Sequence, residues 1–268
     1  MPHKCLTLAA AVTLLALTGC KPDSAVRTGT DVNPKSQAEP QQAGGVPVDP
    51  ATAGTISGIV HFAGKAPERV RIDMSQDPVC SISTMENFSE QYVVDHGNLA
   101  NVYLYVKSGP PAAMNAAPTG PIAPVILDQK GCRYTPHVLA VERDEPVEFR
   151  NSDSTMHNIH TMPTVAGNQV IDVSQGPGFA PQVRRFHAPE LIMPVRYNNH
   201  AWMNAFINVS ATPFFAVSAA DGTFTITGLP AGTYTLGAVH EKLGEQTLQV
   251  TVQPHTTAPA TFTFKPTS

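Results

Sequence analysis

The chain has 268 residues, of which 42% are hydrophobic and 14% charged, enough to bury a core, so a fibrous or wholly disordered protein is excluded. Its formal net charge of -4 offers no basic surface to a phosphate backbone, and we expect no nucleic-acid partner. The 25 prolines and 19 glycines punctuate short β-branched and aromatic runs after residue 54, which predicts an all-β fold.

The first 20 residues predict a lipoprotein signal peptide. Residues 1–4 form a short basic segment, and the apolar run LTLAAAVTLLAL is shorter than the roughly 20 residues of a membrane-spanning helix. The run ends in Leu17-Thr18-Gly19-Cys20, which resembles the bacterial lipobox; the alternative is an ordinary cleavage site. The resemblance implies a lipid on Cys20, and Lys21 favours sorting to the outer membrane. We therefore expect a periplasmic protein whose lipid anchors it to the outer membrane.

Residues 21–53 predict a disordered tether. The segment is rich in Pro, Gln, Ala, Gly and Asp and has no apolar period. Such a sequence buries too little apolar surface to offset the entropy that is lost on ordering. We expect it to hold the folded part away from the membrane.

The four cysteines divide by compartment. Cys5 leaves with the signal peptide and Cys20 carries the lipid, so Cys80 and Cys132 remain in an oxidising periplasm, where two such cysteines pair. The alternative is that one of them is a metal thiolate. Cys132 lies five residues before His137, which is not a tight ligand spacing, and the sequence favours a Cys80–Cys132 disulfide.

From residue 54 onward the apolar residues alternate as in strands with one buried face. The segment GTISGIVHFAG places Ile56, Val60 and Phe62 on one face, and NVYLYVKSG repeats the period. Near the C-terminus, DGTFTITGLPAGTYTLGAVHEKLGEQTLQV predicts a β-meander whose first hairpin turns at Asp221-Gly222. No stretch after residue 54 is convincingly helical.

The meander resembles the carboxypeptidase regulatory-like, transthyretin-like β-sandwich module, whose pattern is DGxFxxxGLPxGxYxL followed by a strand that ends in His-Glu. The resemblance implies such a module at residues 211–268. His240 and Glu241 then read as polar residues at a strand end, with an acid–base pair as the alternative.

Two segments place histidines beside strand ends: FRNSDSTMHNIHTM at residues 149–162 and VRYNNHAWMNAF at residues 195–206. They resemble the cupredoxins, in which a His-Asn-Val/Ile loop supplies one copper ligand and a Cys-x-x-His-x-x-Met loop supplies the others. The resemblance covers about residues 54–253. It implies a cupredoxin-like Greek-key β-sandwich at residues 54–210, followed by the small transthyretin-like module.

By this resemblance His157 and His200 are the imidazole ligands of a copper ion, and Met203 is its weak axial thioether. His160, three residues after His157, is a further ligand or a residue at the rim of the site. Two imidazoles and a thioether suit Cu(I), while three imidazoles suit Cu(II) or another divalent ion. The resemblance thus implies copper as the cofactor.

The chain departs from the cupredoxin pattern at Tyr197, which stands where the family has cysteine. A blue-copper centre needs a thiolate in the plane of its two imidazoles, and tyrosine removes it. A phenol with a pKa of ~10 is a poor ligand unless the metal lowers that value, so phenolate ligation remains the alternative. We expect no blue-copper electron transfer.

These features predict a lipid-anchored periplasmic protein with an altered mononuclear copper site that binds copper, hands it on or carries electrons slowly, with a periplasmic copper or redox partner. The alternative is a metal-free cell-envelope scaffold or partner-binding module. A type 2 copper redox enzyme is a third reading. No Ser-His-Asp, GxSxG, phosphate-loop or HExxH pattern occurs, and we expect no enzyme activity.

Overall fold

The computed structural model describes residues 47–82, 87–117 and 123–266. The predicted signal peptide, its lipidation site Cys20 and most of the predicted tether lie outside these residues. The end of the tether is described, and there Val48 packs against a hydrophobic core. Within the described ranges, no helix combines the length and the apolar character that crossing a membrane requires.

The regular secondary structure of the described residues is nearly all β-strand, as predicted, and the strands form four sheets. The first sheet has the order β15-β1-β3-β2, with β18 also paired to β1, and the second has the order β14-β4-β16-β17. The strands of these two sheets are β1 (Gly54–Phe62), β2 (Val94–Asp95), β3 (Asn98–Leu99), β4 (Tyr103–Ser108), β14 (Phe215–Val217), β15 (Thr223–Leu229), β16 (Gly232–His240), β17 (Gly244–Val252) and β18 (Thr257–Phe264).

The other two sheets have the orders β10-β9-β12-β13-β7 and β11-β8-β5-β6. Their strands are β5 (Val125–Gln129), β6 (Tyr134–Thr135), β7 (Val138–Glu142), β8 (Pro146–Asn151), β9 (His157–Thr161), β10 (Asp172–Gln175), β11 (Gln182–Arg185), β12 (Glu190–Arg196) and β13 (Asn204–Ser210). The two short helices among the described residues are α1 (Pro78–Ser81) and α2 (Pro111–Met114).

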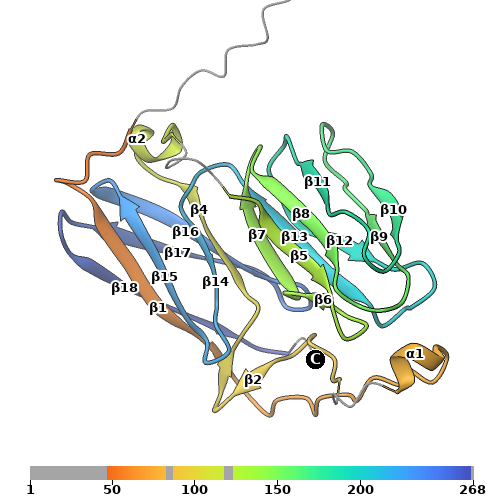
Figure 1. Cartoon of the computed structure of the whole chain (residues 1–268). Helices are drawn as coiled ribbons and strands as arrows, with labels where there is room; N and C mark the ends of the chain where they lie inside the picture. Colours follow the sequence, from red (N-terminus) through yellow and green to blue (C-terminus); the bar gives the residue numbers. More distant parts are fainter. Residues whose placement is uncertain (1–46, 83–86, 118–122, 267–268) are drawn as a thin grey trace, which may run out of the picture. The chain divides into compact units, whose positions relative to one another are not determined.

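One β-sandwich is built from both ends of the described chain. Strand β1 pairs antiparallel with β15 and parallel with β18, so that the orange and blue strands lie side by side in Figure 1. A single core joins its two sheets, with Ile56 and Val60 from β1 packed with Leu104 from β4 and Leu236 from β16. Strands β1 to β4 therefore belong with the C-terminal strands β14 to β18, and the sheets group the chain differently from the expected division at residue 210.

The second sandwich holds β5 to β13, which lie between the two parts of the first sandwich in the sequence. Its core brings Phe149 from β8 together with Ile159 from β9, Val195 from β12 and Ile207 from β13. Parallel pairs join β5 to β8 and β7 to β13, so strands far apart in the sequence become neighbours. This sandwich carries both histidine segments.

The expected strand periodicity is confirmed where it is strongest. Burial alternates strictly along β18 and nearly so along β15, as a sheet with one face on the core requires. The turn before β15 contains Gly222, whose φ of +79° favours glycine, and Asp221 accepts a hydrogen bond from the amide of Thr223 at 3.0 Å. The predicted hairpin at this turn is wrong, because β14 pairs with β4 and β15 pairs with β1, in different sheets. Of the predicted meander, β16 and β17 do form an antiparallel pair.

The predicted disulfide is present between Cys80 and Cys132. Cys80 lies in α1, which is capped by Asp77, whose Oδ1 accepts hydrogen bonds from the amides of Val79 and Cys80. Cys132 lies between β5 and β6. The disulfide therefore links α1, which precedes β4 in the sequence, to the loop between β5 and β6 of the second sandwich.

His137 and Glu241 connect the two sandwiches through a buried hydrogen bond. His137 Nε2 lies 2.6 Å from Glu241 Oε1, and each side chain is 4% exposed. His137 also presents its ring to Phe206 edge to face. Glu241, which the sequence places at a strand end, is thus the buried partner of a histidine from the other sandwich.

Candidate metal centre

His157 is positioned by the polar turn that leads into β9. Asn151, the last residue of β8, donates from Nδ2 to the carbonyl oxygen of Thr155 at 2.9 Å. Its Oδ1 accepts the amide hydrogen of Asp153 at 3.0 Å. These bonds close the turn, and the side chain of His157 that follows it is fully buried.

His200 lies in the tight loop between β12 and β13. The amide of Met203 donates to the carbonyl oxygen of His200 at 2.8 Å, and the amide of Tyr197 donates to the carbonyl oxygen of Met203 at 3.2 Å. The imidazole stacks on Trp202 with ring centroids 4.5 Å apart. Backbone bonds and stacking therefore fix His200, which is buried.

The two imidazoles lie together, with ring centroids 5.9 Å apart, and each has a carboxylate partner. His157 Nε2 lies 2.9 Å from Asp153 Oδ2, and His200 Nε2 lies 3.1 Å from Asp77 Oδ2. A neutral imidazole that donates its Nε2–H to a carboxylate leaves a lone pair on Nδ1. Both histidines are thereby held in the tautomer that can bind a cation through Nδ1.

Neither Nδ1 atom has a hydrogen-bond partner among the residues that the structure describes. Both atoms are buried, and a buried polar atom without a partner costs about 1–3 kcal/mol. Two such atoms in neighbouring imidazoles are a rare arrangement in a folded protein. The donor set fits a copper ion, for which imidazole nitrogen is a suitable ligand.

Asp153 stays ionised despite its partial burial. Burial raises the pKa of its carboxyl, but the hydrogen bond with His157 and those from the amides of Cys132 and Gly131 outweigh this effect. These backbone hydrogen bonds are short, at 2.8 Å from the amide of Cys132 and 2.7 Å from the amide of Gly131. The pKa of Asp153 therefore lies below its ordinary value, and the carboxylate remains an acceptor for the imidazole.

The pKa values of Asp77 and His200 are both shifted below their ordinary values. Burial lowers the pKa of His200, the nearby Asp77 opposes that effect, and His157 adds to it, with a net shift below the ordinary value. For Asp77, burial raises the pKa, but the hydrogen bonds from the amides of Cys80 and Val79 and the electrostatic interactions with the two histidines leave it lowered. Near neutral pH the structure thus favours a neutral His200, the form that binds metals.

Tyr197 lies against both histidines. Its ring centroid is 4.4 Å from that of His200 and 5.8 Å from that of His157, with edge-to-face angles of 76° and 84°. The residue that replaces the expected cysteine is therefore beside the imidazoles. The phenol ring takes up space next to them that a cysteine side chain would leave open.

The structure places the remaining predicted ligands differently. Met203 is buried in the core of the second sandwich, and its backbone bonds put it next to His200. His160 is three positions along β9 from His157 and so points to the opposite face of the strand, where its Nδ1 lies 2.8 Å from Asn198 Oδ1. The structure brings together the imidazoles of His157 and His200, and His160 lies apart from them.

Two residues of the site, Asp77 and Asp153, were not predicted from the sequence. Asp77 and Asp153 orient the imidazoles, and the disulfide lies between them, since Asp77 precedes Cys80 in α1 and Asp153 bonds the amide of Cys132. A carboxylate four residues before His157 is a local signal for Asp153. Nothing local connects Asp77 with His200, because 123 positions separate them (200 − 77).

Part of the chain matches a known protein family. The model of the β-sandwich domain of ER membrane protein complex subunit 7 matches residues 196–264, less than half of the chain. The matched region begins just before His200 and includes strands β13 to β18. No curated protein matches the chain as a relative.

Solved structures resemble about a third of the chain. A copper-containing nitrite reductase (NirK) from Thermus scotoductus SA-01 is 23% identical with a TM-score of 0.30, and the match covers 35% of this chain and 24% of that chain. A purple cupredoxin from Nitrosopumilus maritimus is 18% identical with a TM-score of 0.27, covering 32% and 99%. An oxidized mutant of amicyanin is 17% identical with a TM-score of 0.29, covering 32% and 81%.

Proposed function

We propose that the chain binds one copper ion through Nδ1 of His157 and Nδ1 of His200, with the thioether of Met203 as a weak third ligand. The observation that carries the proposal is the pair of buried Nδ1 atoms without hydrogen-bond partners, each on an imidazole whose Nε2 is held by a carboxylate. The cupredoxin neighbours, one of them named as copper-containing, agree with this metal.

The chemistry of this set favours binding over fast electron transfer. Two neutral imidazoles and a thioether suit Cu(I), and the phenol of Tyr197 replaces the thiolate that a blue centre requires. Asp77 and Asp153 keep the imidazoles in the binding tautomer and raise their basicity. In this proposal the protein holds copper, hands it to a partner, or exchanges electrons slowly.

The proposed setting is the periplasm. The lipobox-like segment that ends in Cys20 would attach the chain to the outer membrane, and the tether would extend the copper site toward a soluble copper or redox partner. The Cys80–Cys132 disulfide agrees with an oxidising compartment.

Copper loading tests the proposal. The purified chain is loaded with Cu(I) or Cu(II), and the bound copper is counted after removal of free metal. We expect one copper per chain for the wild type and at least a tenfold loss of affinity for His157→Ala and for His200→Ala, because each removes one of the two imidazole ligands.

The matched control is His160→Ala, which removes an imidazole from the same strand on the opposite face. This variant should bind copper as the wild type does. Equal, weak copper retention by the wild type and the His157→Ala/His200→Ala double variant would end the copper proposal.

A metal-free scaffold or partner-binding module is the second candidate, and the packing of Tyr197 favours it. The phenol ring contacts both imidazoles and fills space beside them. The similarity of residues 196–264 to a β-sandwich domain of a membrane protein complex points the same way. Under this function, copper loading gives no stoichiometric binding, and the unpartnered nitrogens bind water.

A further inference from the structure

The Cys80–Cys132 disulfide lies between the two histidine–carboxylate pairs. Ligand atoms of Cys80, Asp77 and His200 all lie within 4.8 Å of one another. Ligand atoms of Cys132, Asp153 and His157 form a second group with the same limit. Because the two sulfurs are bonded to each other, the two groups form one continuous cluster around the disulfide.

We propose that reduction of this disulfide converts the cluster into a binding site for one Zn²⁺-like cation, held by the thiolates of Cys80 and Cys132 and the imidazoles of His157 and His200. The site shares its two histidines with the copper centre proposed above but requires neither Met203 nor copper. The residues around the disulfide would thus bind a cation in a second way, which depends on whether the disulfide is reduced.

The ligand set has the composition of a structural zinc site. Two cysteines and two histidines bind Zn²⁺ tetrahedrally at about 2.3 Å for sulfur and 2.0–2.1 Å for nitrogen, which puts neighbouring ligand atoms about 3.3–3.8 Å apart. Within each group the cysteine and histidine ligand atoms lie within 4.8 Å of each other, and the disulfide joins the two groups. The two imidazole rings have centroids 5.9 Å apart, so after reduction the four ligands must draw together around the cation. All four residues are buried, as a closed site requires.

The oxidation state decides whether the sulfurs can be ligands. A disulfide sulfur carries no charge, whereas the metal ligand is the thiolate. A dithiol reductant transfers two protons and two electrons to the S–S bond, giving two cysteine thiols and one oxidised, disulfide-bonded reductant. Binding of the cation then releases both thiol protons to solvent and balances its two positive charges with two thiolates.

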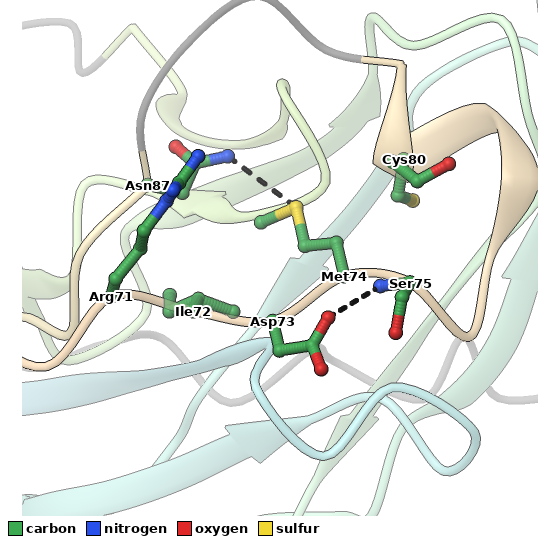
Figure 2. A pocket seen from close by; sticks show the side chains of 8 residues that line it. Arg71, Ile72, Asp73, Met74, Ser75, Cys80 and Asn87 are labelled. Carbon is green, nitrogen blue, oxygen red and sulfur yellow. Dashed lines mark hydrogen bonds between the residues drawn. The ribbon is translucent and has the colours of Figure 1, made fainter.

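A hollow beside Cys80 offers access to the disulfide. Its volume is about 390 Å³, and Met74 and Asn87 line it together with Cys80 (Figure 2). Asn87 donates from Nδ2 to the sulfur of Met74 at 3.5 Å, and Met74 packs in one cluster with Cys80 and Cys132. The sulfur-rich wall of this hollow suits a soft or borderline cation.

Cobalt(II) is the probe for this proposal because it takes the place of Zn²⁺ and its thiolate complexes absorb in the near ultraviolet. The full chain is prepared oxidised, or reduced with a phosphine that is removed before Co²⁺ is added. We expect the reduced chain to bind one Co²⁺ with a thiolate charge-transfer band, and the oxidised chain to show no such band.

Variants assign the ligands. The Cys80→Ser/Cys132→Ser double variant should lack the band, and His157→Ala should weaken Co²⁺ binding at least tenfold, whereas His160→Ala should bind as the reduced wild type does. The proposal is overturned if oxidised and reduced chains give the same spectra or if the band persists unchanged in His157→Ala. It is also overturned if the reduced chain loses its β-sheet circular dichroism and Co²⁺ fails to restore it.

The outcome is separable from that of the copper proposal. Copper binding is measured on the oxidised chain, in which the sulfurs are unavailable as thiolates. Failure of the copper test with success of the cobalt test would leave only the reduced site, and the reverse result would leave only the oxidised one.

Discussion

The chemistry of the candidate centre depends on which nitrogen of each imidazole is committed elsewhere. Asp153 and Asp77 occupy Nε2 of His157 and His200, so Nδ1 is the atom left for a ligand. Leaving two buried nitrogens unpaired costs stability, and a bound cation would offset that cost. The site is therefore defined by its carboxylates as much as by its histidines.

Substitution of Tyr197 tests the role of the missing thiolate. In Tyr197→Cys a thiol stands three residues before His200, beside both imidazoles, and completes the His₂Cys plane of a blue-copper site. We expect the Cu(II)-loaded variant to show an intense thiolate-to-copper absorption in the visible range that the wild type lacks.

Tyr197→Ser is the matched control, since it opens the same space without adding a thiolate. It should bind copper without the intense band. An intense band in the Cu(II)-loaded wild type, or none in copper-bound Tyr197→Cys, would contradict this account of the site.

Among the elements, β1 and β18 decide whether the first sandwich closes. They run parallel with eight registered residue pairs, from Thr55–Thr257 to Phe62–Phe264, although they come from opposite ends of the described chain. Their close approach depends on Gly58, because a Cβ atom there would lie 1.7 Å from the carbonyl oxygen of Ala260. Glycine is required at this position by contact between backbones.

Gly58→Ala should therefore force β1 and β18 apart. We expect the free energy of unfolding to fall by about 2 kcal/mol or more, measured by urea unfolding, because overpacking against backbone cannot be relieved by a rotamer change. The neighbouring Ser57→Ala, which removes only a partly exposed hydroxyl group, should cost less than about 1 kcal/mol. Equal stability of Gly58→Ala and the wild type would contradict the close packing of the two strands.

At the scale of the whole molecule, buried histidines lie where the two sandwiches meet. His137 pairs with Glu241, and the adjacent His240 is buried against Tyr92 and Phe264. Burial lowers the pKa of His240 to about 4, with Glu241 opposing the shift and His137 and Lys242 adding to it. The folded protein thus keeps His240 neutral at pH values where the unfolded chain protonates it.

This difference predicts acid sensitivity with a definite direction. The pKa of His240 lies below its ordinary value of 6.5, so the unfolded chain binds the proton more readily, and stability is lost as the pH falls from 6.5 toward 4. The loss amounts to up to about 3 kcal/mol at 1.36 kcal/mol per pKa unit. Urea unfolding of the metal-free protein between pH 7.5 and 4 measures it.

His240→Gln supplies the comparison, because glutamine has no proton to bind in this range. Carboxylates such as Asp153 also lose stabilising bonds in acid, and they contribute equally to both proteins. The stability difference between wild type and variant should therefore change with pH below 6.5. A constant difference between pH 7.5 and 4 would assign the acid sensitivity to other groups.

The local pattern of the chain was sufficient for the strands and for the disulfide. Alternation of apolar residues predicted the buried faces of β1 and β15, and the Asp221-Gly222 pair marked a turn that the structure contains, although the strands beside it lie in different sheets. Exclusion of Cys5 and Cys20 left one pair of cysteines, which is bonded. These features depend on neighbours within a few residues or on simple counting, so the sequence contains them directly.

The tertiary structure alone decided which elements meet. Pairing of β1 with β18 joins segments about 200 residues apart, and the contact of Asp77 with His200 requires α1 to be tied to the second sandwich by the disulfide. Hydrophobic alternation says that a strand has a buried face but not which sheet covers it. Sequence by itself thus determined the all-β class, the disulfide and the histidine candidates. The carboxylates that orient those histidines, and the disulfide's place between them, follow only from how the sheets and loops pack.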